Sequence, residues 1–103
     1  MSKVIVEEQP TPQRDDYWEL VVRCVTDVEK GGRLSTATPY SVTFSDDRAS
    51  CTEVEGVPFA IDLLIDRIES YGKEWDLLNA GMTAKILVLG DASAIPARTY
   101  LVG

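Results

Sequence analysis

Apolar and polar residues alternate along two segments of this chain, and this alternation limits the possible folds more than any other feature. Residues 17–28, YWELVVRCVTDV, place four apolar side chains on one face of an extended chain, namely Trp18, Leu20, Val22 and Cys24. Residues 39–45, PYSVTFS, alternate aromatic or aliphatic residues with Ser and Thr. Because successive side chains of a strand point to opposite faces, both segments predict half-buried strands. The fold therefore contains a sheet with one face against a core.

Shorter segments extend this predicted sheet. Strands are predicted over residues 3–7, 49–55, 83–90 and 97–103. Residues 83–90 are apolar on both faces, which is typical of a central strand. Residues 8–16, which hold two prolines, and residues 29–38, which hold two glycines, predict loops.

Residues 57–80 predict a helix, with Pro58 in its first turn and Gly81 as its C-terminal cap. At 100° per residue, one apolar arc contains Ala60, Ile61, Leu64, Ile65, Ile68, Tyr71, Trp75 and Leu78. The arc keeps its phase across Gly72, which favours one continuous or kinked helix, whereas glycine propensity favours a break by about 1 kcal/mol. We therefore expect a single compact α+β domain over residues 1–103. Its mainly antiparallel sheet of about five to six short strands carries the helix on one face.

The segment EKGGRLSTATP, residues 29–39, predicts the end of a hairpin between residues 17–28 and 39–45. An odd-length loop at Gly31-Gly32-Arg33 lets Leu20 face Phe44, so that both apolar faces are buried together. The alternative is a small-anion site, formed by Gly31, Gly32, Arg33, Ser35 and Thr36. No predicted helix follows these glycines directly, so the segment does not match a P-loop.

The two cysteines, Cys24 and Cys51, predict reduced thiols. A two-residue turn at Asp46-Asp47 places Cys51 opposite Val42, with a strand between the cysteines. Their separation is then about 10 Å, beyond the roughly 7 Å limit between the Cα atoms of a disulfide. Reduced thiols are typical of a cytoplasmic protein.

Composition argues against several classes of function. The chain contains no histidine, which removes the commonest general base and metal ligand. Its formal net charge of −7 argues against direct nucleic-acid binding. Its apolar runs are too short for a membrane span, and residues 1–10 do not resemble a secretory signal. We expect a cytoplasmic, non-catalytic protein without a metal or cofactor.

Acidic residues concentrate in residues 46–76, where Asp and Glu outnumber Lys and Arg nine to three. On the predicted helix, Asp62, Asp66, Glu69 and Asp76 share the outer arc, and Phe59, Leu63 and Leu77 lie beside it. An acidic face edged by apolar side chains suits docking to a basic or mixed protein surface. A solvated helix face with no role is the alternative.

These features support three hypotheses about function. The first is an interaction protein, such as an inhibitor, an immunity-type protein or a regulatory adaptor, that docks through the acidic face. One version of it imitates the phosphates of nucleic acid. The second is a structural subunit or homo-oligomer joined through a strand edge at residues 3–7 or 97–102. The third is a small-anion-binding module that uses the Gly31–Thr36 loop.

Overall fold

The computed structural model describes residues 2–44 and 51–103, with side chains outside residues 41–55. Every regular element in these ranges is a strand, and none is a helix. The strands are β1 Lys3–Val6, β2 Thr11–Arg14, β3 Tyr17–Cys24, β4 Val28–Glu29, β5 Arg33–Phe44, β6 Cys51–Glu55, β7 Phe59–Ser70, β8 Lys73–Trp75, β9 Leu77–Leu78, β10 Thr83–Leu89 and β11 Thr99–Val102. The fold is therefore all-β.

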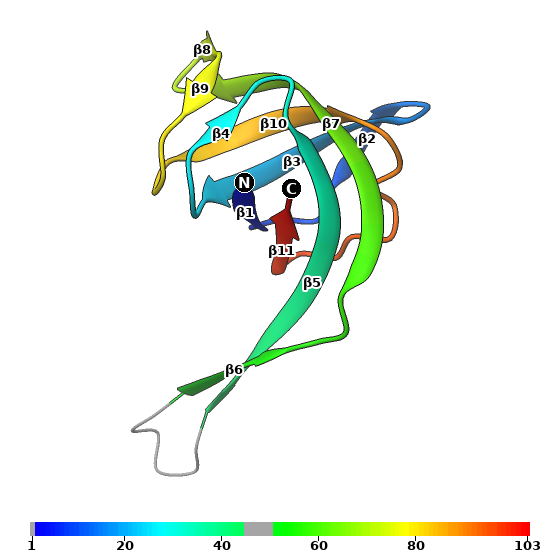
Figure 1. Ribbon diagram of the computed structural model, residues 1–103, viewed down its shortest axis with the longest axis vertical. Helices are drawn as coiled ribbons and strands as arrows, with labels where there is room; N and C mark the ends of the chain where they lie inside the picture. Colours follow the sequence, from blue (N-terminus) through cyan, green and yellow to red (C-terminus); the bar gives the residue numbers. More distant parts are fainter. Residues whose placement is uncertain (1, 45–50) are drawn as a thin grey trace.

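Six of these strands close into an antiparallel barrel (Figure 1). Their order is β5-β11-β1-β3-β10-β7, and the pairing of β5 with β7 completes the ring. β10 lies between β3 and β7, which confirms the central strand predicted at residues 83–90. A closed sheet satisfies the backbone hydrogen bonds of its strands on both sides.

The core fills the interior of the barrel with alternate side chains of these strands. On β3, Leu20, Val22 and Cys24 are buried, and Trp18 packs against them, which confirms the predicted inner face of residues 17–28. The two largest buried side chains of β10, Ile86 and Val88, are two residues apart and also lie inside. Burial of apolar area contributes about 25 cal/mol per Å² and drives this closure.

The predicted helix over residues 57–80, and with it the α+β fold, was wrong. Residues 59–70 form β7, in which Leu63, Ile65 and Ile68 are buried. A bulge in the pairing with β10 lies between Ile65 and Arg67, and it shifts the inward side by one residue. The resulting three-residue spacing from Ile65 to Ile68 imitates a helical period. Its three β-branched isoleucines favour the strand.

The predicted hairpin between residues 17–28 and 39–45 was also wrong. β3 pairs with β1, β10 and β2, whereas β5 pairs with β11, β7 and β6. The turn at residues 29–32 instead leads from β4 into β5, which starts at Arg33 and so includes most of the predicted 29–38 loop. The prediction assumed that strands adjacent in the sequence pair with each other. β5 instead forms hydrogen-bonded ladders with β11 on one side and β7 on the other. Residues 11–14 within the predicted 8–16 loop likewise form β2 beside β3.

The termini lie within the barrel wall (Figure 1). β1 pairs with β11 and β3, and β11 pairs with β1 and β5. The strand edges proposed for assembly at residues 3–7 and 97–102 are thus covered by neighbouring strands over these pairings. Any assembly by strand pairing needs another edge.

Candidate functional site

A two-stranded ribbon projects from one end of the barrel (Figure 1). Its pairing runs from Tyr40 opposite Glu55 to Phe44 opposite Cys51. Among the described residues, β6 pairs with β5 alone, so its outer edge has no strand partner. The described molecule measures 44 × 26 × 23 Å, with a radius of gyration of 14.0 Å. A compact chain of this length has a radius of gyration of about 13 Å. We name residues 40–44 and 51–55 the ribbon.

The base of the ribbon is held by contacts with the barrel. The rings of Tyr40 and Tyr100 lie 4.9 Å apart at an angle of 36°, and Lys3 Nζ lies 4.7 Å from the Tyr100 ring. The Gly56 N–H donates to the Pro39 carbonyl at 2.6 Å. Aromatic and cation–π contacts of this kind contribute about 0.5–1.5 kcal/mol each. The Tyr40–Tyr100 contact therefore ties the base of the ribbon to β11.

The opposite end of the sheet carries a second edge strand, β8. β8 pairs with β7 through Ser70 and Lys73, Glu69 and Glu74, and Ile68 and Trp75. No other pairing of β8 occurs in the described ranges. The strands β6 and β8 are the two ends of the main strand order, β6-β5-β11-β1-β3-β10-β7-β8.

The turn between β7 and β8 holds an unusual aromatic residue. Tyr71 and Gly72 have φ angles of +54° and +72°, so both have the left-handed conformation of a type I′ hairpin turn. This conformation suits Gly but costs a tyrosine about 1–2 kcal/mol. The Tyr71 side chain is 82% exposed, so packing within the described chain does not offset this cost. Strain of this kind concentrates at functional positions.

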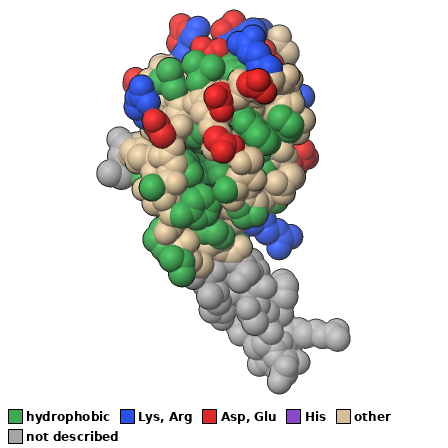
Figure 2. Space-filling model, turned by 90° about the vertical axis from the view of Figure 1, so that its right-hand side faces the viewer, with side chains coloured by type: hydrophobic (Ala, Val, Ile, Leu, Met, Phe, Trp, Pro, Cys, Tyr) green, Lys and Arg blue, Asp and Glu red, His purple; other side chains and the backbone are tan. Residues whose placement is uncertain are grey.

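A hollow of about 660 Å³ lies beside this turn. It is lined by residues of β3, β7, β8 and β10, and five of its side chains are charged: Arg67, Lys73, Lys85, Glu69 and Glu74. Figure 2 shows that most charged side chains on this face gather at the end away from the grey residues. The hollow is therefore more basic than a chain whose net charge is −7.

The charged side chains of the hollow differ in their partners. Arg67 lies 3.3 Å from Glu69 and 3.5 Å from Glu74, and Lys85 lies 3.5 Å from Glu19. Lys73 forms no ion pair among the described residues. Lys73 is therefore available to a carboxylate from another molecule.

The residues of the predicted acidic face are dispersed. Phe59 is partly buried against the core and Leu63 is buried, so neither edges an outer face. Asp76 and Leu77 lie beyond β8, beside a second hollow of about 580 Å³. The fold does not bring these residues together as one face with the three acids of β7.

The three acids of β7 have partners within the chain. Asp62 lies 2.9 Å from Arg33 Nη1, and Glu69 lies beside Arg67. Asp66 accepts a hydrogen bond of 2.8 Å from the Tyr17 hydroxyl. Burial and the Asp66 carboxylate together raise the pKa of Tyr17. Binding of a partner protein by these acids stays a prediction. To bind it, each acid would have to give up its ion pair or hydrogen bond within the chain for one to the partner.

The predicted anion loop has its amides engaged. The Gly31 N–H donates to the Ile65 carbonyl at 2.8 Å, and the Gly32 N–H donates to the Glu29 carbonyl at 3.1 Å. Arg33 lies beside Asp62, and the Ser35 hydroxyl donates to the Val102 carbonyl. Thr36 lies further along β5, opposite Val102. Anion binding there stays a prediction, and it would require these contacts to be replaced.

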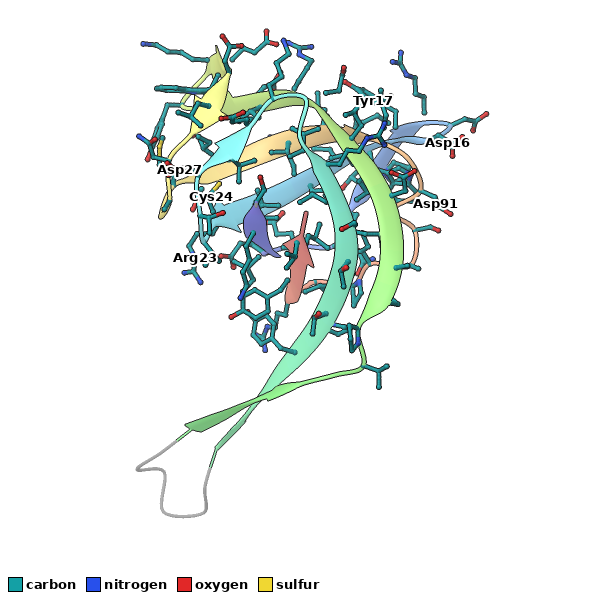
Figure 3. All side chains as sticks on the ribbon, viewed as in Figure 1. Asp16, Tyr17, Arg23, Cys24, Asp27 and Asp91 are labelled. Atoms are coloured by element: carbon teal, nitrogen blue, oxygen red, sulfur yellow. The ribbon has the colours of Figure 1, made fainter. Side chains whose placement is uncertain are left out.

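Cys24 is buried at the end of β3 and is a free thiol. Burial, and then the charge of Asp27, raise the pKa of Cys24 to about 11. Figure 3 shows Cys24 close to Asp27 and away from Tyr17. The thiol therefore stays protonated and packs as a small apolar group. The observed pairing places Cys51 opposite Phe44, so the predicted pairing with Val42 was wrong, and the Cys51 side chain lies outside the described residues.

The described residues contain no cluster of three or more histidine, cysteine, aspartate or glutamate residues arranged to hold a metal ion. They also contain no helix with the length and hydropathy needed to span a membrane. Comparison with protein-family models, curated proteins and solved structures finds no match for this chain. Inferences about function therefore rest on the ribbon and the β8 end of the sheet.

Sequence reasoning missed these two features for different reasons. The strands of the ribbon were predicted over residues 39–45 and 49–55, but the projection was not. It depends on where β11 begins, since its first residue, Thr99, pairs with Pro39 and β5 has no β11 partner beyond that residue. The β8 edge was hidden by the predicted helix. The pair Tyr71-Gly72 between isoleucine-rich and tryptophan-containing segments was the available signal for a turn.

Proposed function

We propose that this protein is a non-catalytic structural subunit that self-associates through the ribbon. One observation carries the proposal: β6 is an unpaired edge held away from the barrel on a ribbon with an anchored base. This develops the hypothesis of assembly through a strand edge, with the edge moved to β6.

An isolated two-stranded ribbon is only marginally stable in water, because its faces have little to pack against. Unpaired N–H and C=O groups along β6 also invite another strand. Addition of a strand from a second molecule satisfies these groups and gives the ribbon a third strand. Self-association would give the projecting ribbon a role.

The edge of the sheet at β2 is less suited to pairing than the edge at β6. β2 pairs with β3 and contains Pro12, which lacks an N–H, and Pro10 precedes it closely. β6 contains no proline, and its sequence CTEVE includes Thr52 and Val54, which favour strands. Self-association through β6 is therefore favoured over pairing through β2.

The interaction-protein hypothesis has less support from the fold. Its acidic residues Asp62, Asp66 and Glu69 each have a partner within the chain, and the helix that was to align them is absent from the described residues. Exchange of such pairs for contacts to a partner gains little. It stays an alternative to self-association.

The test is the molar mass of the purified chain in solution. We expect light scattering coupled to size exclusion to give a mass above the monomer's 11.4 kDa that rises with concentration. A shortened variant, with residues 42–53 replaced by Asn-Gly, keeps the Ser41–Val54 pair and every barrel pairing of β5. This variant should be a monomer with an intact β-rich circular dichroism spectrum.

Two results would overturn the proposal. One is a wild-type chain that stays monomeric from micromolar to millimolar concentration. The other is a folded shortened variant that associates as the wild type does. Residues 42–53 take no part in the barrel pairings, so we expect the shortened variant to keep the barrel, and the circular dichroism spectrum checks that loss of association does not reflect unfolding.

A further inference from the structure

We draw no further inference here: the strongest candidate, the hollow of about 660 Å³ lined by β3, β10 and the β7–β8 hairpin, has four of its five charged side chains (Arg67, Glu69, Glu74 and Lys85) in ion pairs within the chain, and nothing in the structure shows what would occupy it.

Discussion

The substitution Gly90→Ala tests whether the barrel packs as described at the end of β10. Gly90 has a φ angle of +133°, and its N–H donates to the Asp16 carbonyl at 2.8 Å. A Cβ at this position would collide with the Asp62 carbonyl oxygen and lie 2.9 Å from Leu63 Cδ2. Figure 3 shows Asp16 and Asp91, next to Gly90, at the same side of the barrel. The β2–β3 turn, the end of β10 and β7 therefore meet at this glycine.

The magnitude has two parts. The positive φ costs a residue with a Cβ about 1–2 kcal/mol, and insertion of a methyl group against packed atoms costs about 1–3 kcal/mol. We expect Gly90→Ala to lower the free energy of unfolding by about 2–5 kcal/mol. At about 4–8 °C per kcal/mol, the midpoint of thermal unfolding falls by roughly 8–40 °C.

The matched control is Gly81→Ala. Gly81 has a φ angle of +87°, but a Cβ there meets no atom within 4 Å. Only the backbone part applies, so the expected cost is about 1–2 kcal/mol. Urea unfolding followed by tryptophan fluorescence in the shortened variant measures both, free of self-association. Equal costs for the two substitutions would show that nothing crowds Gly90 and would refute the described packing.

Two further predictions concern single side chains. Tyr71→Asn should raise the free energy of unfolding of the shortened variant by about 1 kcal/mol. The reason is that Asn-Gly suits a type I′ turn, whereas Tyr71 is strained there. A lower thermal midpoint would contradict this prediction. The Cys24 thiol should react slowly with iodoacetamide in the folded chain at pH 8. Because its folded pKa of about 11 lies above the ordinary thiol pKa of 9.0, Cys24 stabilises the fold below pH 9, and this contribution is lost as the pH rises to 11. Comparison of unfolding with Cys24→Ala across pH 8–11 isolates this loss, and parallel curves would contradict it.

The sequence was informative where alternation was undisturbed. Residues 17–28 and 83–90 keep a period of two, so the strands and the buried face of β3 could be predicted. The period failed at one point, because the bulge at Asp66 shifts the inward side within β7. A single extra residue converts a strand pattern into one that fits a helix. The turn at Tyr71-Gly72 was not predicted, because tyrosine is rare at positions of positive φ in such turns.

Strand order was beyond the sequence for a different reason. Hairpin pairing between neighbours was assumed at residues 29–38, although β5 pairs with β11 and β7. Both choices bury apolar side chains, and the preference comes from closing the whole barrel. The candidate site followed from that closure, because the barrel covers β1 and β11 and leaves β6 and β8 at the ends of the sheet. The acidic stretch at residues 46–76 was noticed in the sequence, but the docking role was assigned to Asp62, Asp66, Glu69 and Asp76 on a helix face.

Three strand edges of the described sheet, those of β2, β8 and β6, differ in how they oppose unwanted pairing. β2 carries a proline, which removes a hydrogen-bond donor whatever the partner. β8 carries both Lys73 and Glu74, and charged side chains on an edge strand oppose pairing. β6 combines residues that favour strands with two glutamates, and it projects beyond the barrel. A chain selected only to stay monomeric would gain from a charge or proline on every edge and from a shorter ribbon. The proposed self-association through β6 accounts for this difference, because it needs one edge that admits a strand and others that oppose it.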